Sequence, residues 1–258
     1  MLSLLSLLFT LGCSMSSALT ASGPPRQAAA PVPADPFPAP REGLKLAADL
    51  ADGGPVMLDV VNEFSRVTGQ TLVIDPQTRM QLQTTKVGLN QDIAVPPDQV
   101  YFVVETLLVQ RDFALVRLND REPRMLALYS LAIPNALALR GRAVFVRSDE
   151  SVLYSRHPAL LITTSLDLPY TDVRTLSNSM RSLFQDANTQ QIIPVGNTNT
   201  LILTGTGSNV FALVEMLRAI DDAARRQFEH RATTKPEKPA PDEKSKEEEK
   251  PQDPKSGH

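Results

Sequence analysis

The sequence lacks tryptophan and contains a single cysteine, Cys13, among its 258 residues. One cysteine excludes an intrachain disulfide and any metal cluster built on cysteines. Histidine is also scarce: the chain has only His157, His230 and His258, and no second histidine or cysteine stands near His157 at the spacing of a metal site. The formal net charge of −3 does not favour a nucleic-acid partner. Any folded domain must therefore be stabilised by packing alone.

Motifs of catalysis and of nucleotide binding are missing as well. The chain has no nucleophile elbow of the kind found in serine hydrolases. Gly205-Thr206-Gly207 stands between an expected strand and an expected helix, but it lacks the third glycine of a dinucleotide loop and the Gly-Lys-Ser/Thr of a P-loop. We therefore expect a tight turn and a helix start there, and no catalytic residue, no cofactor and no metal ion in the protein.

The remaining titratable candidates have structural explanations. His157 precedes a proline and is expected in a loop between domains. Asp75 and Pro76 are expected where a strand ends. Asp221 and Asp222 are expected at the end of a helix, where acidic residues are electrostatically unfavourable but tolerated at a surface.

The N-terminal segment, residues 1–21, is expected to direct export. Residues 2–12 are apolar, which is too short for a spanning helix of ~20 residues and typical of a signal segment. Residues 10–13 resemble a lipoprotein cleavage site that would lipidate Cys13, although Thr10 stands where leucine is usual. Residues 19–21 suit ordinary signal peptidase. The first basic residue is Arg26, so neither site has the usual basic segment before it, and both alternatives stay open.

Composition divides the rest of the chain. Residues 22–42 are rich in proline and alanine and are expected to form an extended, solvated linker. Residues 223–258 are expected to form a charged, disordered tail, because their last part mixes lysines and acids with almost nothing apolar. Between these ends the sequence predicts two globular domains, residues 43–131 and 159–222, joined by a connecting segment at residues 132–158.

The first domain is expected to combine helices with short strands. Apolar residues at helical spacing predict a helix that ends at Gly69, and Pro96-Pro97-Asp98 is expected to begin a second helix with an apolar stripe from Val100 to Leu108. The expected strands are residues 71–75, a more polar strand at 82–89, and a hairpin of residues 113–118 and 124–131. A strand is also expected at residues 142–147, and the domain to which it belongs stays open.

The second domain has the predicted order β-α-β-β-α. The expected elements are strands at residues 160–168, 191–195 and 200–204, a helix through Val173, Leu176, Met180, Leu183 and Phe184, and a helix through Val210, Leu213, Val214, Leu217 and Ile220. Helices with one apolar stripe must cover one face of a sheet, so each domain is predicted to be a two-layer α+β sandwich. Thr163, Thr164 and Ser165 fit a solvated or docking face, and equally an ordinary outer face.

Two stretches of the sequence resemble the periplasmic N-terminal domains of secretins, the outer-membrane channels of type II and type III secretion and of type IV pilus systems. The first stretch is EFSRVTGQTLVIDPQTRMQLQTT followed by VPPDQVYFVVETLLVQRDFALV, which is similar to the first periplasmic domain. Asp112 stands where the family often has glycine before Phe113. The second stretch is LITTSLDLPYTDVRTLSNSMRSLF joined to NTNTLILTGTGSNVFALVEMLRAID, which is similar to the ring-forming repeat domain. Together they span roughly residues 44–222.

The resemblance implies a non-catalytic periplasmic component that assembles with other proteins. In the family, the first domain contacts inner-membrane platform components and the repeat domains stack into rings. The implied partners are therefore a secretin pore protein or an inner-membrane secretion platform protein, and self-association is a further expectation. Secretins continue into a β-rich pore domain that the matching stretches do not include, so we expect that this chain is not itself the pore.

Two alternatives accompany this interpretation. A lipid-anchored assembly factor would use Cys13 as its tether and the linker as its reach, which would place it at the outer membrane. The ring-forming domain is also related in layout to the KH fold, which binds single-stranded nucleic acid. That function needs a Gly-x-x-Gly clamp and a basic groove, and the sequence has neither, so no nucleic-acid partner is expected.

Overall fold

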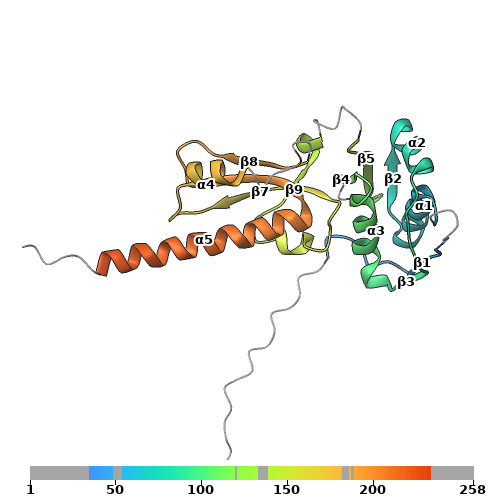
Figure 1. The fold of residues 1–258 in the computed structure, drawn as a ribbon, viewed down its shortest axis with the longest axis horizontal. Coiled ribbons are helices and arrows are strands. Elements are labelled where there is room, and N and C mark those ends of the chain that lie inside the picture. The colour runs from blue at the N-terminus through green and yellow to red at the C-terminus, as the bar shows by residue number, and fades with distance from the viewer. Residues whose placement is uncertain are drawn as a thin grey trace, which may run out of the picture. The chain divides into compact units, whose positions relative to one another are not determined.

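The computed structural model describes residues 35–48, 54–119, 121–132, 139–181, 186 and 189–233 (Figure 1). Helices and strands are mixed along these ranges, which confirms the predicted α+β class. Their order is β1 (Leu44–Leu46), α1 (Met57–Thr68), β2 (Thr71–Ile74), α2 (Pro76–Thr84), β3 (Ile93–Val95), α3 (Val100–Val109), β4 (Phe113–Asn119), β5 (Met125–Ser130), β6 (Val144–Phe145), β7 (Leu161–Asp167), α4 (Val173–Met180), β8 (Gln191–Pro194), β9 (Thr200–Thr206) and α5 (Gly207–Thr233). The signal segment, Cys13 and the end of the charged tail lie outside the described residues and stay predictions.

Helix α1 follows the apolar spacing of its sequence. Its buried residues are Met57, Val60, Val61, Phe64, Val67 and Thr68. Gly69 ends the helix in the left-handed conformation, with φ of 70°, and its N–H donates to the carbonyl of Ser65. Residues with a Cβ adopt this conformation at a cost, so glycine is the residue expected there. The predicted end of α1 is confirmed.

Helix α2 replaces the strand predicted at residues 82–89, which was wrong. The Asp75 carboxylate accepts hydrogen bonds from the backbone N–H groups of Gln77 and Thr78, at 3.0 Å each, and Pro76 occupies the first turn. An aspartate cap followed by proline is a strong helix start. The helix buries little beyond Thr78 and Leu82, so it has no clear apolar stripe and its sequence signal lies in the cap.

The first region, residues 35–132, contains two small sheets. Strands β1 and β3 pair antiparallel, and a second sheet has the order β2-β5-β4. In that sheet β4 and β5 form the predicted antiparallel hairpin, and β2 lies parallel to β5. The helix start expected at Pro96-Pro97-Asp98 is a 3₁₀ turn, Pro97–Gln99, that continues into α3. Helix α3 buries Val100, Val104 and Leu108 as predicted.

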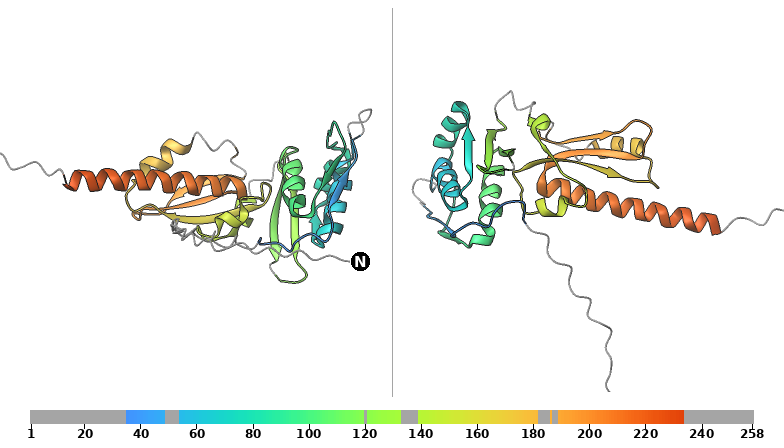
Figure 2. Two further views of the ribbon diagram at one scale, coloured as in Figure 1. Left: turned by 90° about the horizontal axis from the view of Figure 1, so that it is seen from below. Right: turned by 180° about the vertical axis from the view of Figure 1, so that it is seen from behind.

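The second region, residues 139–233, contains a four-stranded sheet with the order β6-β7-β9-β8. Strand β6 lies parallel to β7, with Val144 opposite Ile162, so the strand expected at residues 142–147 joins this sheet. Figure 2 shows α4 and α5 on the same side of the strands. Leu201 and Leu203 of β9 are fully buried in the same apolar cluster as Val210, Val214 and Leu217 of α5. The predicted order β-α-β-β-α is therefore confirmed.

Helix α5 is longer than predicted, because it continues through Thr233. Residues 208–233 contain neither proline nor glycine, so nothing in the sequence interrupts the helix. Asp221, expected at a helix end, lies within α5, and its Oδ1 accepts from the N–H of Tyr170 at 2.9 Å and the hydroxyl of Thr171 at 2.8 Å. Ile220 was expected to be buried and is 36% exposed. The predictions for Leu183 and Phe184 fall outside the described residues.

The end of the predicted linker is packed against the folded part of the chain. Phe37 is buried and stacks on Tyr101, with 5.1 Å between the ring centroids. The solvated state expected for residues 22–42 is therefore wrong at Phe37. One continuous apolar cluster includes residues of both predicted domains, among them Phe64 and Val214, and the boundaries of those domains remain predictions.

Candidate interaction surfaces

The face of the four-stranded sheet that lies opposite α4 and α5 carries exposed apolar side chains. Alternate residues of a strand point to opposite faces. Leu203, which is fully buried with the helices, is opposite Ile192, so Ile193 and its partner Ile202 belong to the other face. Phe145, opposite Thr163, belongs there too. Phe145 is 63% exposed and Ile193 is 40% exposed, so this face, called here the open face, has an apolar component.

The polar residues predicted to lie on an outer face divide between the two faces. Thr163 and Ser165 are half-buried and belong to the open face, where the hydroxyls of Thr163 and Thr204 lie 2.9 Å apart. Thr164 is fully buried on the side of the helices, so its assignment to an outer face was wrong. Three consecutive residues of a strand cannot share a face, and the period of two could have corrected this from the sequence.

Strand β8 forms one edge of the sheet. Among the described residues, no strand pairs with its outer side. Edge strands are able to pair with a strand of another chain, and charged residues, proline or shortness usually limits this pairing. Strand β8 has four residues and ends in Pro194, which cannot donate to a ladder, so an added strand would pair through Gln191–Ile193.

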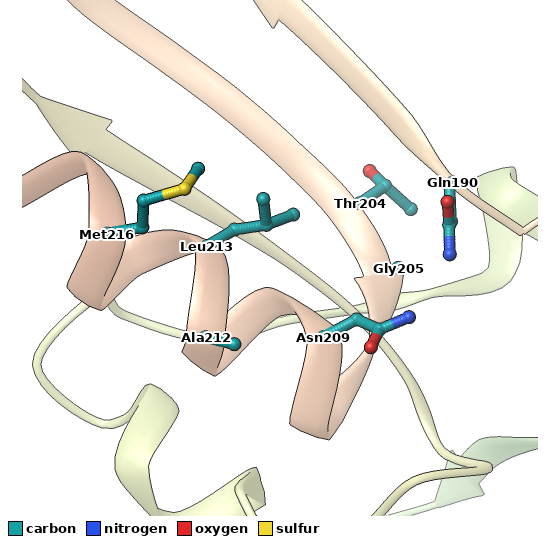
Figure 3. Close-up of a pocket in the computed structure, with 7 residues that line it drawn as sticks. All are labelled: Gln190, Thr204, Gly205, Asn209, Ala212, Leu213 and Met216. Carbon is teal, nitrogen blue, oxygen red and sulfur yellow. The ribbon is translucent and has the colours of Figure 1, made fainter. Parts of the chain in front are cut away.

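A groove of about 260 Å³ lies between α5 and the strands, next to β8. Its lining consists of Gln190, Thr204, Gly205, Asn209, Ala212, Leu213 and Met216. Figure 3 shows Leu213 and Met216 projecting from α5 towards the strands, with Gln190 and Thr204 on the strand side. The apolar side chains of α5 suit contact with an apolar side chain of a partner. The side-chain amides of Asn209 and Gln190 suit hydrogen bonds with a nearby peptide group of that partner. The groove contains no nucleophile with an adjacent base.

The Gly205-Thr206-Gly207 segment contains the expected helix start, but the tight turn expected there was wrong. Gly205 and Thr206 are the last residues of β9, and Gly207 begins α5 directly. A Cβ on Gly207 would lie 2.5 Å from the carbonyl oxygen of Tyr154 and 2.8 Å from that of His157. This close approach of two backbone segments explains the glycine without any phosphate ligand.

His157 lies in the loop before β7, as expected, but it is fully buried in an ionic cluster that the sequence did not indicate. Its Nδ1 is 2.7 Å from Oε1 of Glu105 on α3, and its Nε2 is 3.3 Å from Oδ1 of Asp35. The second oxygen of Glu105, Oε2, accepts from the N–H of Ala159 at 3.0 Å. Residues far apart in the sequence thus meet at one imidazole. The one signal of this cluster in the sequence is Glu105, an acidic residue among the apolar residues on the buried face of α3.

The cluster holds a charged imidazolium at neutral pH. Burial alone would lower the pKa of His157, but the charge of Glu105 and the hydrogen bonds to Asp35 and Glu105 raise it to about 9. Burial would raise the pKa of Asp35, but the hydrogen bonds from His157 and from the Phe37 N–H lower it. Both ring nitrogens are occupied by carboxylates, so neither can serve a substrate or a metal ion unless an ion pair is broken. The cluster is structural: it joins α3, the loop that leads to β7 and the segment before β1 that contains Asp35, Pro36 and Phe37, called here the arm.

No group of three or more His, Cys, Asp or Glu side chains in the described part of the chain is arranged to hold a metal ion. None of the helices described is both long and apolar enough to cross a membrane.

Comparisons with known proteins find similarity among solved structures alone. No protein-family model matches the chain, and no curated protein matches it. Among solved structures, the Klebsiella pneumoniae type II secretion system outer membrane complex, with PulD, PulS and the PulC HR domain, is 18% identical over 64% of this chain, with a TM-score of 0.45. The N-terminal domain of the secretin XcpQ from Pseudomonas aeruginosa is 16% identical, covers 70% of this chain and 64% of its own, and has a TM-score of 0.23.

A third similar structure is the GspC–GspD complex of the type II secretion system from enterotoxigenic Escherichia coli. It is 16% identical, covers 70% of this chain and 98% of its own, and has a TM-score of 0.24. The match to the Klebsiella complex spans only 25% of the chain found there. The solved structures that resemble this chain therefore include N-terminal domains of secretins, as the motifs predicted. Similarities with such low identities and TM-scores carry no argument about the partner or the function of this chain, which must be argued from its own residues.

Proposed function

We propose that this chain is a non-catalytic periplasmic component of a secretin-type protein secretion or pilus system. In this role it docks a secretin pore protein or an inner-membrane platform protein. Two sequence stretches that resemble secretin N-terminal domains, in the family's order, support the proposal. The observation that carries it is the open face, where Phe145 of β6 and Ile193 of the edge strand β8 are exposed.

Docking on this surface would combine two kinds of contact. A strand of the partner would add to β8 and gain main-chain hydrogen bonds, while its side chains would enter the groove beside Leu213 and Met216. Phe145 and Ile193 would supply apolar area on the open face, where solvent-exposed rings and branched chains favour association. A second copy of this chain could occupy the same surface, and self-association is therefore part of the proposal.

The location of the protein is also part of the proposal. The expected signal segment would export the chain to the periplasm, and lipidation of Cys13 would hold it at the outer membrane. Labelling cells with an alkyne fatty acid tests the second statement. Incorporation that is lost in Cys13→Ser supports the anchor, and a chain that is exported without label excludes it.

Site-specific photo-crosslinking in the native envelope tests the proposed function. A photoreactive amino acid at Phe145 or Ile193 should give adducts with a secretin pore or platform protein, identified by mass spectrometry. The same group at Met80, which is 67% exposed on α2, is the matched control. The proposal is wrong if a folded, exported protein gives no adduct with either class at the first two positions, or the same adducts at all three.

A further inference from the structure

A second hollow lies beside the β2-β5-β4 sheet. Its volume is about 220 Å³, and it is lined by Pro36, Phe37, Gln70, Arg117, Asn119, Arg124 and Leu126. The arm at Pro36 and Phe37 forms one side, and the end of β4 with the start of β5 forms the other. Among the described residues that line it, the charged side chains are those of Arg117 and Arg124.

The two arginines differ in their present contacts. Arg124 has one carboxylate, Oε1 of Glu122, at 3.5 Å from its Nε, and the Glu122 side chain is 82% exposed. A pair of this kind is weak in water and is readily exchanged. Arg117 donates from Nη1 to the hydroxyl of Tyr154 at 3.2 Å, with its guanidinium carbon 6.0 Å from the centre of that ring. Arg117 is thereby positioned by an aromatic side chain.

Gln70 adds an unused acceptor. Its side chain is 2% exposed, and its Nε2 donates to the hydroxyl of Tyr101 at 3.2 Å. Within the described residues, Oε1 of Gln70 has no hydrogen-bond partner. A buried acceptor without a partner is unfavourable, and an N–H donor from a ligand would remove that penalty. Phe37 and Leu126 are apolar and buried, so the lining combines cationic, accepting and apolar groups.

We propose that this hollow binds an acidic peptide segment. A glutamate or aspartate carboxylate would contact Arg117 and Arg124, whose planar guanidinium groups favour carboxylates. A backbone N–H of the segment would donate to Oε1 of Gln70, and a neighbouring apolar side chain would pack against Phe37. The proposal rests on the proposed function, because the docking partner would supply the segment.

The surroundings leave room for a longer segment. A neighbouring hollow of about 330 Å³ shares Arg117 and Asn119 with the first one and adds Arg121, Leu118 and Val144. A peptide that leaves the first hollow along β4 would therefore meet a third arginine. This continuity favours an extended acidic segment over a single small carboxylate.

The test uses the full chain and two capped tripeptides, acetyl-Leu-Glu-Leu-amide and acetyl-Leu-Gln-Leu-amide, in an NMR titration. The glutamate peptide should shift the side-chain amide of Gln70 and the Nε–H of Arg124 in a saturable manner. The glutamine peptide should bind at least about tenfold more weakly, because a charge-assisted contact becomes a neutral one. Equal binding of both peptides, or no saturable shift at these groups, would overturn the proposal.

Three variants locate the site. Arg124→Gln should abolish binding of the glutamate peptide, and Glu122→Gln should strengthen it by a few fold because a competing carboxylate is removed. Arg147→Gln is the matched control: Arg147 is 70% exposed, pairs with Asp149 at 3.0 Å and lies outside the hollow. Thermal unfolding checks that each variant is folded. The site is wrong if Arg124→Gln binds normally or if Arg147→Gln loses binding to the same extent.

The two proposals fail separately. If the peptide binds at Arg124 but no adduct with a secretin or platform protein forms, the acidic-peptide site is supported and the assembly role is contradicted. If such adducts form but the peptide does not bind, the assembly role is supported and this site is contradicted.

Discussion

The two larger sheets of this protein are covered differently. In the β2-β5-β4 sheet, the consecutive residues 113–116 of β4 and 126–128 of β5 are all buried. One face contributes Leu115 and Leu128 to the main apolar cluster, and the other contributes Ala114 and Val116 to a second cluster with Leu161. In β7 of the β6-β7-β9-β8 sheet, buried residues alternate with accessible ones from Ile162 to Asp167, and in β9 the alternation runs from Thr200 to Leu203.

This difference assigns separate roles to the two sheets. The parts of β4 and β5 that are buried on both faces form a scaffold, since any change in their side chains alters the core. A sheet with one uncovered face can change its partner without losing its fold. Backbone contacts link the two: the N–H of Leu115 on β4 donates to the carbonyl of Ala159 at 2.8 Å, just before β7 begins. The ionic cluster of His157, Glu105 and Asp35 lies beside this link.

Removing the buried ion pair should have the largest effect. Glu105→Ala leaves a buried imidazolium with one partner and an unpaired N–H on Ala159, so we expect a loss of about 3–5 kcal/mol in the free energy of unfolding. Urea denaturation of the purified chain measures it. Glu63→Ala breaks the exposed pair with Arg66 and should change stability little. Equal effects of the two substitutions would show that the cluster does not join the sheets.

Truncation on the two faces of the second sheet should give unequal results. Leu203→Ala removes a fully buried side chain beneath α5 and should cost about 2–5 kcal/mol. Its neighbour Ile202 belongs to the open face and is only half-buried, so Ile202→Ala should cost clearly less. Denaturant midpoints compare the pair. Similar losses would mean that the open face is covered as fully as the other one.

Stability should fall with rising pH because of His157. Its pKa is raised from an ordinary value near 6.5 to about 9 in the folded state. Its contribution is therefore fully present below about pH 6.5 and is lost as the pH rises through about 9. Asp35 has a lowered pKa, so its contribution is present above its ordinary pKa and is lost as the pH falls through the folded value. Urea titrations from pH 6 to 10 should show the alkaline decline, and His157→Gln should lack it.

Polar substitutions on the open face should have the smallest effect on stability. Phe145→Ser should change the free energy of unfolding by less than about 0.5 kcal/mol, because the ring is mostly in water. The same substitution should weaken crosslinking to the partner from a probe at Ile193. A large loss of stability would show that Phe145 is part of the core, and unchanged crosslinking would remove it from the interaction surface.

The sequence could predict the elements that carry a local signal. Gly69 ends α1 through its left-handed conformation, and the turn before β9 and the apolar stripe of α5 gave the order of the second region. The helix α2 was missed because an Asp75-Pro76 start was interpreted only as a strand exit. The end of α5 was placed too early at Asp221 and Asp222, although acidic residues are unfavourable at the C-terminal end of a helix and no residue that breaks a helix follows before Thr233.

The sequence by itself determined the α+β class, the order of the second region and the resemblance to secretin N-terminal domains, because periodicity and turn residues are local properties. Only the tertiary structure decided which face of the sheet stays open and which residues meet at His157. Asp35 and His157 are separated by 122 residues, and no spacing rule relates them. Such contacts depend on how the elements pack, since burial makes an ion pair strong only where the fold brings its partners together.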